Sequence, residues 1–221
     1  MIIDILTIFP HMFDNFINES IIKRAQEKQL VKINIHNIRD YSIYNNKQVD
    51  DTPYGGGGGM VLMCDPIFKA VEHLRRDDTL VIMMTPQGKK YNQEKAYKLS
   101  KYKHIIIICG HYEGFDERIL SIVDLELSIG DYILTGGELP SMIITDSIVR
   151  LIDGVITKES HINDSFNNNL LDYPTYTKPR IYNGMEVPEV LVSGNHANIE
   201  KWRIEQKIKK TKEKRPDLLE E

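Results

Sequence analysis

Short apolar runs alternate with helix-patterned segments over the first two thirds of the sequence, and this alternation constrains the fold more than any other feature. The runs at 1–9, 79–84 and 104–109 have the composition of buried strands. The segments 13–29 and 65–76 repeat apolar residues at helical spacing. Because such alternation is typical of parallel sheets, we predict an α/β domain with a mainly parallel sheet flanked by helices.

The character of the sequence changes after Asp153. Residues 157–171 are polar and rich in asparagine, without periodicity, which predicts a flexible interdomain linker. A helical pattern returns at 198–211, but the segment after the linker has only about fifty residues, which is marginal for a core of its own. We therefore expect an α/β domain at 1–156 and a small, mostly helical domain at 172–221.

Charge is distributed unevenly along the chain. The whole sequence has a formal charge of −4, yet residues 201–215 hold eight basic and two acidic side chains, which gives +6 locally. Such asymmetry indicates either a polyanionic partner or the solvated face of an amphipathic helix. Charge alone does not separate these two interpretations.

Several classes of protein are disfavoured by the cysteines and by the N-terminus. Cys64 and Cys109 are far apart and lack metal-ligand spacing, so neither a zinc site nor a disulfide framework is expected. The N-terminal run contains Asp4 and no basic region, unlike a signal peptide. No apolar stretch reaches transmembrane length. We predict a soluble, cytoplasmic protein without a membrane partner.

Loops that contain glycine follow three of the predicted strands, at 85–88, 110–114 and 129–140. Ligands bind beyond the carboxyl ends of parallel strands, and glycine lets the backbone approach a ligand closely, so we predict one shared cleft. The alternative is that these glycines only close tight turns. The run Gly55–Gly59 lacks the ending of a phosphate-binding loop, and it is interpreted either as a flexible linker or as a constrained turn.

A family resemblance is carried by five motifs taken together and in order. They are Tyr54-Gly-Gly-Gly-Gly-Gly-Met60, Thr85-Pro-Gln-Gly88, Cys109-Gly-His-Tyr-Glu-Gly-Phe-Asp-Glu-Arg118, Ser128-Ile-Gly-Asp-Tyr-Ile-Leu-Thr-Gly-Gly-Glu-Leu-Pro140 and Gly194-Asn-His-Ala197. The sequence strongly resembles the bacterial tRNA (guanine-N1)-methyltransferases of the SPOUT superfamily. This resemblance implies a deep trefoil knot in the C-terminal part of the α/β domain and a homodimer with its active sites at the interface.

The resemblance also implies that S-adenosylmethionine is the methyl donor, held largely by backbone groups of the three loops. The matched positions are Met83, Met84, Thr85, Pro86, Gly110, Tyr112, Glu113, Gly114, Ile129, Gly130, Asp131, Tyr132, Ile133, Leu134, Gly136, Gly137 and Pro140. Members of the family depend on magnesium, but no cluster of ligands in this sequence identifies a metal site.

The implied reaction moves a methyl group to N1 of guanosine 37 in tRNA. Because N1 carries a proton, a general base must remove it, and Asp164 matches the family's catalytic aspartate. Negative charge then develops on O6, and Arg150 matches the arginine that stabilises it. Without the resemblance, Asp164 is interpreted as a turn residue and Arg150 as a charge on a helix surface.

Contacts with tRNA, rather than with DNA, are expected in the C-terminal segment. The candidate phosphate partners are Lys178, Arg180, His196, Lys201, Arg203, Lys207 and Lys210. Tyr173 and Tyr176 are candidates for stacking on a splayed base, although tyrosines more often pack within the protein.

The sequence departs from the family pattern at a few positions. His111 stands where arginine is usual, and Gly58 stands where proline is common. Two alternatives to the methyltransferase stay open. The departure at His111 suggests a catalytically silent RNA-binding module with the same fold, and the glycine loops alone suggest an α/β enzyme that uses a nucleotide cofactor such as NAD.

Overall fold

The computed structural model describes residues 1–157 and 164–219. The chain divides into two compact units, unit 1 at Met1–Ile156 and unit 2 at Thr157–Glu221. None of the helices within the described ranges combines the length and the apolar character needed to cross a bilayer.

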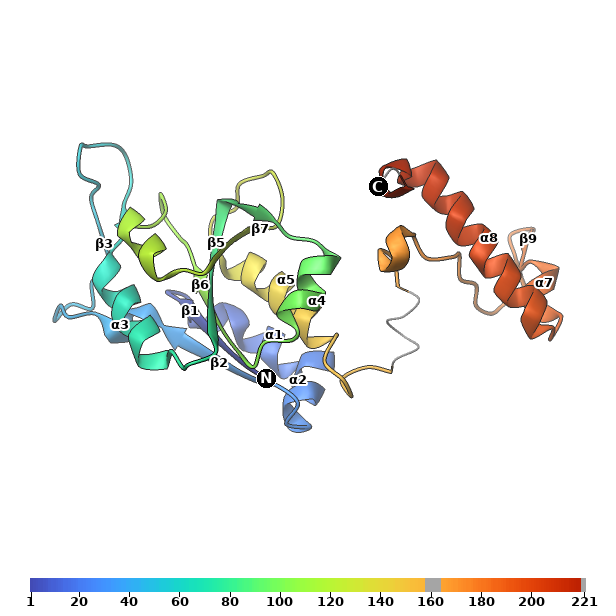
Figure 1. Ribbon diagram of the computed structural model, residues 1–221, viewed down its shortest axis with the longest axis horizontal. Helices are drawn as coiled ribbons and strands as arrows, with labels where there is room; N and C mark the ends of the chain where they lie inside the picture. Colours follow the sequence, from blue (N-terminus) through green and yellow to red (C-terminus); the bar gives the residue numbers. More distant parts are fainter. Residues whose placement is uncertain (158–163, 220–221) are drawn as a thin grey trace. The chain divides into compact units, whose positions relative to one another are not determined.

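Unit 1 is built around a five-stranded sheet with the strand order β2-β1-β6-β5-β7 (Figure 1). All four neighbouring pairs run parallel, which confirms the mainly parallel sheet of the predicted α/β domain. The strands are β1 (Ile2–Thr7), β2 (Lys32–Asn37), β5 (Thr79–Lys90), β6 (His104–Cys109) and β7 (Leu125–Ser128). A separate antiparallel pair is formed by β3 (Asp50–Asp51) and β4 (Val61–Leu62).

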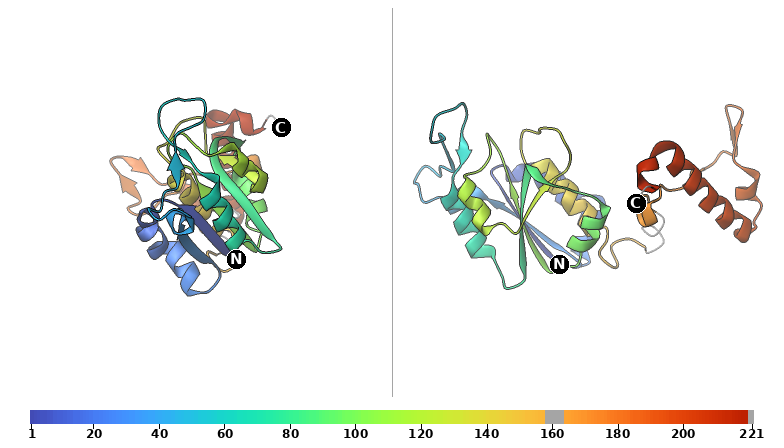
Figure 2. Two further views of the ribbon diagram at one scale, coloured as in Figure 1. Left: turned by 90° about the vertical axis from the view of Figure 1, so that its left-hand side faces the viewer. Right: turned by 45° about the horizontal axis from the view of Figure 1, so that its top comes forward.

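Helices cover both faces of this sheet. Figures 1 and 2 show α3 on one side, and α4 and α5 on the other. The helices of unit 1 are η1 (Pro10–Phe13), α1 (Asp14–Asn18), α2 (Ser20–Glu27), η2 (Ile38–Tyr41), α3 (Cys64–Leu74), α4 (Gln93–Leu99), η3 (Glu117–Ile122) and α5 (Glu138–Val149).

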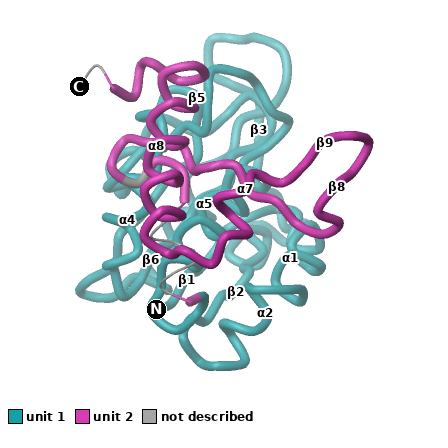
Figure 3. The backbone as a smooth tube through the Cα atoms, turned by 90° about the vertical axis from the view of Figure 1, so that its right-hand side faces the viewer, with its two compact units in different colours: residues 1–156 teal, residues 157–221 magenta. Residues whose placement is uncertain are grey.

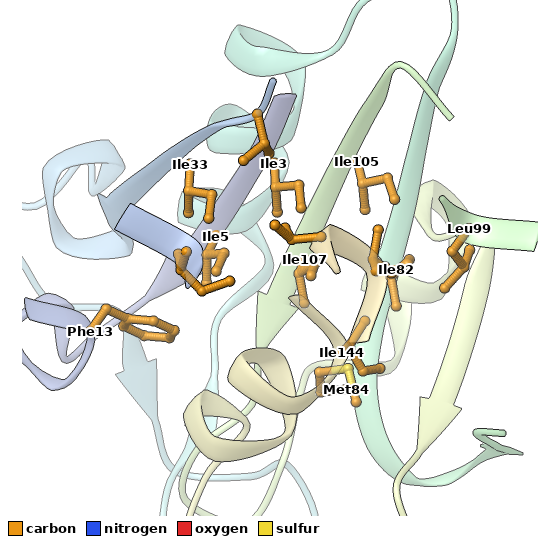
Figure 4. Packing of buried hydrophobic residues seen from close by; sticks show 14 of the residues in the cluster. Ile3, Ile5, Phe13, Ile33, Ile82, Met84, Leu99, Ile105, Ile107 and Ile144 are labelled. Atoms are coloured by element: carbon orange, nitrogen blue, oxygen red, sulfur yellow. The ribbon is translucent and has the colours of Figure 1, made fainter. Parts of the chain in front are cut away.

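The core has two layers because successive residues of a strand face opposite sides of the sheet. On β1 and β6, odd-numbered residues such as Ile5 and Ile107 pack with Ile144 of α5, as does the even-numbered Ile82 of β5 (Figure 4). On the other face, Ile108 of β6 and Val81 of β5 pack with Ile67 of α3. Each fully buried isoleucine stabilises the fold by about 1.5–3 kcal/mol, so the sheet is anchored on both faces.

Two elements differ from the sequence-based expectation. The helix expected at 13–29 is interrupted between α1 and α2, where Glu19 is extended and Ser20 has a φ of 51°. Strand β5 continues past its expected end at Met84, because an irregularity between Met84 and Lys89 lets it pair a second time with β7. Lys89 and Lys90 at the end of β5 are thereby paired with Leu127 and Ser128 of β7.

Unit 2 contains two longer features, a β-hairpin and a basic helix (Figure 3). Asn183 and Gly184 at the tip of the hairpin both have positive φ, as a tight two-residue hairpin turn requires. The side chain of Asn195 caps the long helix by accepting from the N–H of Asn198. The elements are η4 (Asn167–Asn169), β8 (Ile181–Tyr182), β9 (Met185–Glu186), α7 (Glu189–Val192), α8 (His196–Lys214) and η5 (Pro216–Leu219).

The predicted linker at 157–171 is described only in part, because residues 158–163 lie outside the described ranges. Its remaining residues group with unit 2 and include η4. The N–H of Leu171 donates to the Thr211 hydroxyl of α8 at 2.9 Å. Because Thr211 is fully buried, the end of this segment packs against α8.

Candidate active site

Three loops that follow strands of the sheet meet at one cavity in unit 1. It encloses about 320 Å³ beside the carboxyl ends of β5, β6 and β7, near the lower limit for small-molecule pockets. The lining residues are Met84, Thr85, Pro86, Gly110, His111, Tyr112, Glu113, Gly114, Phe115, Leu127, Ser128, Ile129, Gly130, Tyr132, Ile133, Leu134, Thr135, Gly136, Gly137 and Pro140. The expected cleft at this sheet edge is therefore present.

The positions assigned to a cofactor from the sequence line this cavity, with two exceptions. Met83 faces the α3 side of the sheet and is buried in that core, because it alternates with Met84 along β5. Asp131 is exposed, and its Oδ2 lies 3.2 Å from Nζ of Lys90. The structure thus places neither side chain among the lining residues.

Five lining residues were missed by the sequence reasoning, namely His111, Phe115, Leu127, Ser128 and Thr135. Four of them directly follow or precede a predicted position, and Leu127 lies two residues before Ile129, near the end of β7. Their proximity in sequence is the signal that would have found them, because a loop that folds around a cavity presents consecutive residues to it.

Glycines allow close backbone crossings beside the cavity. A Cβ built on Gly137 would lie 2.7 Å from the nitrogen of Gly110 and 2.8 Å from Cα of Cys109. A Cβ on Gly88 would lie 2.4 Å from the backbone nitrogen of Leu127. Because these neighbours are backbone atoms, they cannot rotate away, and any side chain would force the segments apart. Glycine is required here for packing and not for flexibility.

The glycine run at 55–59 is joined to the turn at 110–114. A Cβ on Gly59 would lie 2.5 Å from Cγ of Glu113, and Gly59 has a φ of +80°. The N–H of Glu113 also donates to the carbonyl of Met60 at 3.0 Å. The end of the run is therefore a constrained turn, which decides between the two interpretations of the sequence.

A buried polar group of residues lies next in sequence to the lining residues Gly110, Gly137 and Pro140. Glu138 begins α5 and accepts a hydrogen bond from the Thr7 hydroxyl at 2.7 Å. Cys109 Sγ lies 3.0 Å from the Ser141 hydroxyl. Burial and the negative charge of Glu138 raise the pKa of the Cys109 thiol far above its usual range. Cys109 therefore remains a neutral thiol and does not act as a nucleophile.

The two predicted catalytic residues lie in different units. Arg150 follows the last residue of α5, whereas Glu138 at the other end of this helix adjoins the cavity. Twelve residues (150 − 138) at the helical rise separate these ends by about 18 Å, farther than an arginine side chain reaches. Asp164 is half-buried in unit 2. Arg150 is therefore not among the residues that line the cavity of its own chain.

A second buried polar cluster crosses the sheet away from the cavity. The Asp4 carboxylate contacts Nε2 of His104 at 2.6 Å and Nε2 of His36 at 2.8 Å, and it accepts from the Asn34 amide at 2.7 Å. The sequence reasoning did not identify this cluster. In the part of the chain that the structure describes, no group of three or more His, Cys, Asp or Glu side chains is arranged to hold a metal ion.

Comparison with known proteins adds a decisive observation. The model of a family described as tRNA (Guanine-1)-methyltransferase TrmD matches residues 1–221, the whole chain. The chain belongs to this tRNA (guanine-1)-methyltransferase family. The resemblance inferred from the five motifs is thereby confirmed.

Relatives of this methyltransferase family share more than half of their residues with the chain. A protein of Staphylococcus haemolyticus (strain JCSC1435) is 57% identical over 223 residues, which cover 100% of this chain and 91% of the relative. Proteins of Staphylococcus epidermidis and of Staphylococcus aureus (strain JH9) are 58% and 57% identical, with the same coverage. Each is named tRNA (guanine-N(1)-)-methyltransferase.

The basic side chains that the sequence analysis named as candidate phosphate partners belong to unit 2 of this member of the tRNA (guanine-1)-methyltransferase family. Lys178, His196 and Lys201 are exposed. The Arg203 guanidinium lies 4.9 Å from the centre of the Tyr173 ring, and Lys207 Nζ lies 5.4 Å from it. Tyr173 thus has cation–π partners inside unit 2, which fixes its orientation beside basic groups.

Proposed function

We propose that the chain transfers a methyl group from S-adenosylmethionine to N1 of guanosine 37 in tRNA, in the cytoplasm. The observation that carries this proposal is the convergence of three family-matched loops on one cavity, in a chain whose whole length matches the family. When bound, this cofactor supplies an electrophilic methyl group on a positively charged sulfur.

The residues of the cavity fit this cofactor. Ile129, Leu134 and Pro140 provide apolar walls for a flat purine ring. The glycines at 136–137 leave main-chain donors and acceptors accessible. Glu113 brings a carboxylate to the same lining, where it can face the cationic part of the ligand.

Two side chains would carry the proton and the charge. Asp164 accepts the N1 proton of guanine as the nucleophile forms, and Arg150 donates hydrogen bonds to the O6 oxygen as it becomes negative. Lys178, His196, Lys201 and Arg203 would neutralise phosphates, so that residues 172–221 act as the tRNA-binding domain.

The placement of Arg150 supports a homodimer with shared active sites. Arg150 directly follows α5, about 18 Å from the other end of that helix, which adjoins the cavity. In a dimer, the partner subunit's Arg150 would therefore serve this cavity. Apolar side chains remain exposed on α5 and on η1, among them Leu139 (50%), Ile143 (49%) and Met12 (47%). Such a patch marks a surface for association, and in a dimer it would be the same patch on both subunits.

The backbone crossings support a trefoil knot around the cavity. The end of β5 pairs a second time with β7, with Gly88 close against the backbone of Leu127. The chain then returns from β7 to Gly110, where Gly137 donates its N–H to the Gly110 carbonyl at 2.7 Å. We propose that α5 leaves through the loop that these crossings close, although most folded chains avoid threading.

The proposed activity is tested with methyl-labelled S-adenosylmethionine and tRNA transcripts that carry G or A at position 37. We expect label on N1 of guanosine 37 and none on the A37 transcript, because adenine at this position offers neither the N1 proton nor O6. Calorimetry with S-adenosylmethionine and with NAD accompanies the assay. Cofactor binding without transfer would support a silent module, and binding of NAD alone would support the other alternative.

The shared site is tested by mixing two inactive chains. Arg150→Ala removes the arginine, and Leu134→Trp fills the cavity with an indole. A heterodimer purified through two different tags contains one intact cavity facing one intact arginine, so we expect about half of the wild-type activity. If each chain used its own Arg150, neither site of the heterodimer would be complete, and the activity would stay at the level of the single variants.

A further inference from the structure

A carboxylate that is almost completely buried directly follows the lining residue Gly137. Glu138 is 2% exposed and is the first residue of α5, where helical N–H groups favour negative charge. Its Oε1 accepts from the Thr7 hydroxyl at 2.7 Å. Burial of a carboxylate is costly unless its oxygens are hydrogen-bonded. A hydrogen-bond donor to Oε2 would therefore stabilise the buried charge.

A histidine faces this second oxygen without reaching it. His111 Nδ1 lies 4.0 Å from Glu138 Oε2, which is too long for a hydrogen bond. Among the residues that the structure describes, this buried Nδ1 has no hydrogen-bond partner. The same imidazole lines the cavity and packs edge-on against Phe9 and Tyr112, with ring centres 4.9 Å and 5.0 Å away.

Gly136 keeps the space between the two groups open. A Cβ on Gly136 would lie 2.3 Å from Oε2 of Glu138 and 2.6 Å from Nδ1 of His111. His111 and Gly136 also form an isolated antiparallel bridge. The backbone therefore already holds the two loops together, and a small shift of the imidazole would complete the side-chain contact.

We propose that His111 is a positioning residue, whose Nδ1–H donates to the Glu138 carboxylate when the cofactor fills the cavity. The bond holds the turn at 110–114 against the start of α5 and so fixes one wall of the cavity. Filling the cavity removes water, and a hydrogen bond to a charge is stronger in a low dielectric. The inference rests on the proposed function, because it concerns the binding of the same cofactor.

Two replacements of His111 separate the hydrogen bond from packing. His111→Phe keeps a flat ring against Phe9 but has no N–H, whereas His111→Arg keeps N–H donors. By calorimetry on the full-length protein, we expect the phenylalanine variant to bind S-adenosylmethionine about tenfold more weakly, as for the loss of a hydrogen bond to a charged group. The arginine variant should stay within about threefold of wild type. His73→Phe, an exposed histidine of α3 outside the cavity, is the matched control.

A double-mutant cycle tests whether His111 and Glu138 act as one unit. Glu138→Gln alone is expected to weaken binding about tenfold, and the combined variant to be no weaker than either single one. Independent effects would multiply to about a hundredfold. Melting temperatures measured without cofactor should show no coupling, because the two groups are 4.0 Å apart in this structure.

Each outcome has a definite meaning. Wild-type affinity in the phenylalanine variant, or multiplied effects in the cycle, overturns the role of His111 and leaves the proposed function intact. Loss of affinity in the arginine variant equal to that in the phenylalanine variant also overturns it, because packing would then be the cause. Absence of S-adenosylmethionine binding by the wild-type protein removes the proposed function, and this inference with it.

Discussion

Replacement of Asp164 with asparagine is expected to lower kcat for tRNA methylation by roughly 10²–10⁴-fold. Asparagine has nearly the same shape as aspartate, but its amide cannot accept the N1 proton of guanine. Because Asp164 belongs to unit 2 and the cavity to unit 1, the affinity for S-adenosylmethionine should stay within about twofold. Single-turnover methyl transfer and calorimetry measure the two quantities separately.

Asp153→Asn is a matched control, since Asp153 is an exposed aspartate outside the cavity lining. Its kcat should equal that of the wild type. If Asp164→Asn kept full turnover, Asp164 would have no part in proton removal. A parallel loss of cofactor binding and turnover would instead indicate that Asp164 supports the structure of the site.

The sheet was predictable because its central strands are buried on both faces. All six residues of β6 are buried, so its apolar run is continuous and its limits were found from the sequence. Helix α5 begins at Glu138 and contains Pro140 in its first turn, where a proline is tolerated because its missing N–H has no helical partner.

The backbone crossings could not be predicted from local patterns. The need for glycine at position 88 comes from Leu127, and the need at position 137 comes from Gly110 and Cys109. Each contact joins segments far apart in the sequence, and periodicity contains no information on such pairs. The sequence indicated close turns at these glycines, but not which segments would meet there.

The residues of the candidate site also fall into two groups, those predicted from local sequence patterns and those that local patterns did not indicate. The loops of the cavity were found because glycines and carboxylates follow strands, whereas the roles of Arg150 and Asp164 came from family resemblance alone. Neither residue has a local signal, since one ends a helix and the other lies in a polar segment. His111 was noted only as a departure from the family pattern, because its relation to Glu138 depends on the folded chain.

Asp4 was predicted from the sequence to lie in a strand, but no role was predicted for its side chain. In the structure this side chain connects three strands of the sheet, β1, β2 and β6. Its carboxylate can only accept, so Nε2 of His104 and Nε2 of His36 both carry protons that they donate to it. The Thr79 hydroxyl lies 2.6 Å from the other nitrogen of His104 and donates to it in the neutral tautomer. A polar chain therefore runs across β5, β6, β1 and β2 inside the α3-side core.

The acid dependence of stability follows from the pKa of Asp4. Burial alone would raise this pKa, but hydrogen bonds from His36, Asn34 and His104 outweigh it and lower it from 3.8 to about 2. A lowered folded-state pKa gives stability that is present above pH 4 and is lost as the pH falls through 2. The shift corresponds to about 2 kcal/mol.

Asp4→Asn is expected to destabilise unit 1 by about 3 kcal/mol at neutral pH, because an amide offers one acceptor oxygen and turns a donor toward a histidine N–H. The melting temperature should fall by roughly 10 °C. Hydrogen exchange of the β1 and β6 amides reports on unit 1, while fluorescence of Trp202, the single tryptophan, reports on unit 2.

Asp40→Asn, which removes an exposed pair with Lys47, is the control and should cost less than about 1 kcal/mol. The difference between Asp4→Asn and wild type should shrink as the pH falls from 4 to 2, and a constant difference over this range would show that the charge of Asp4 does not stabilise the sheet.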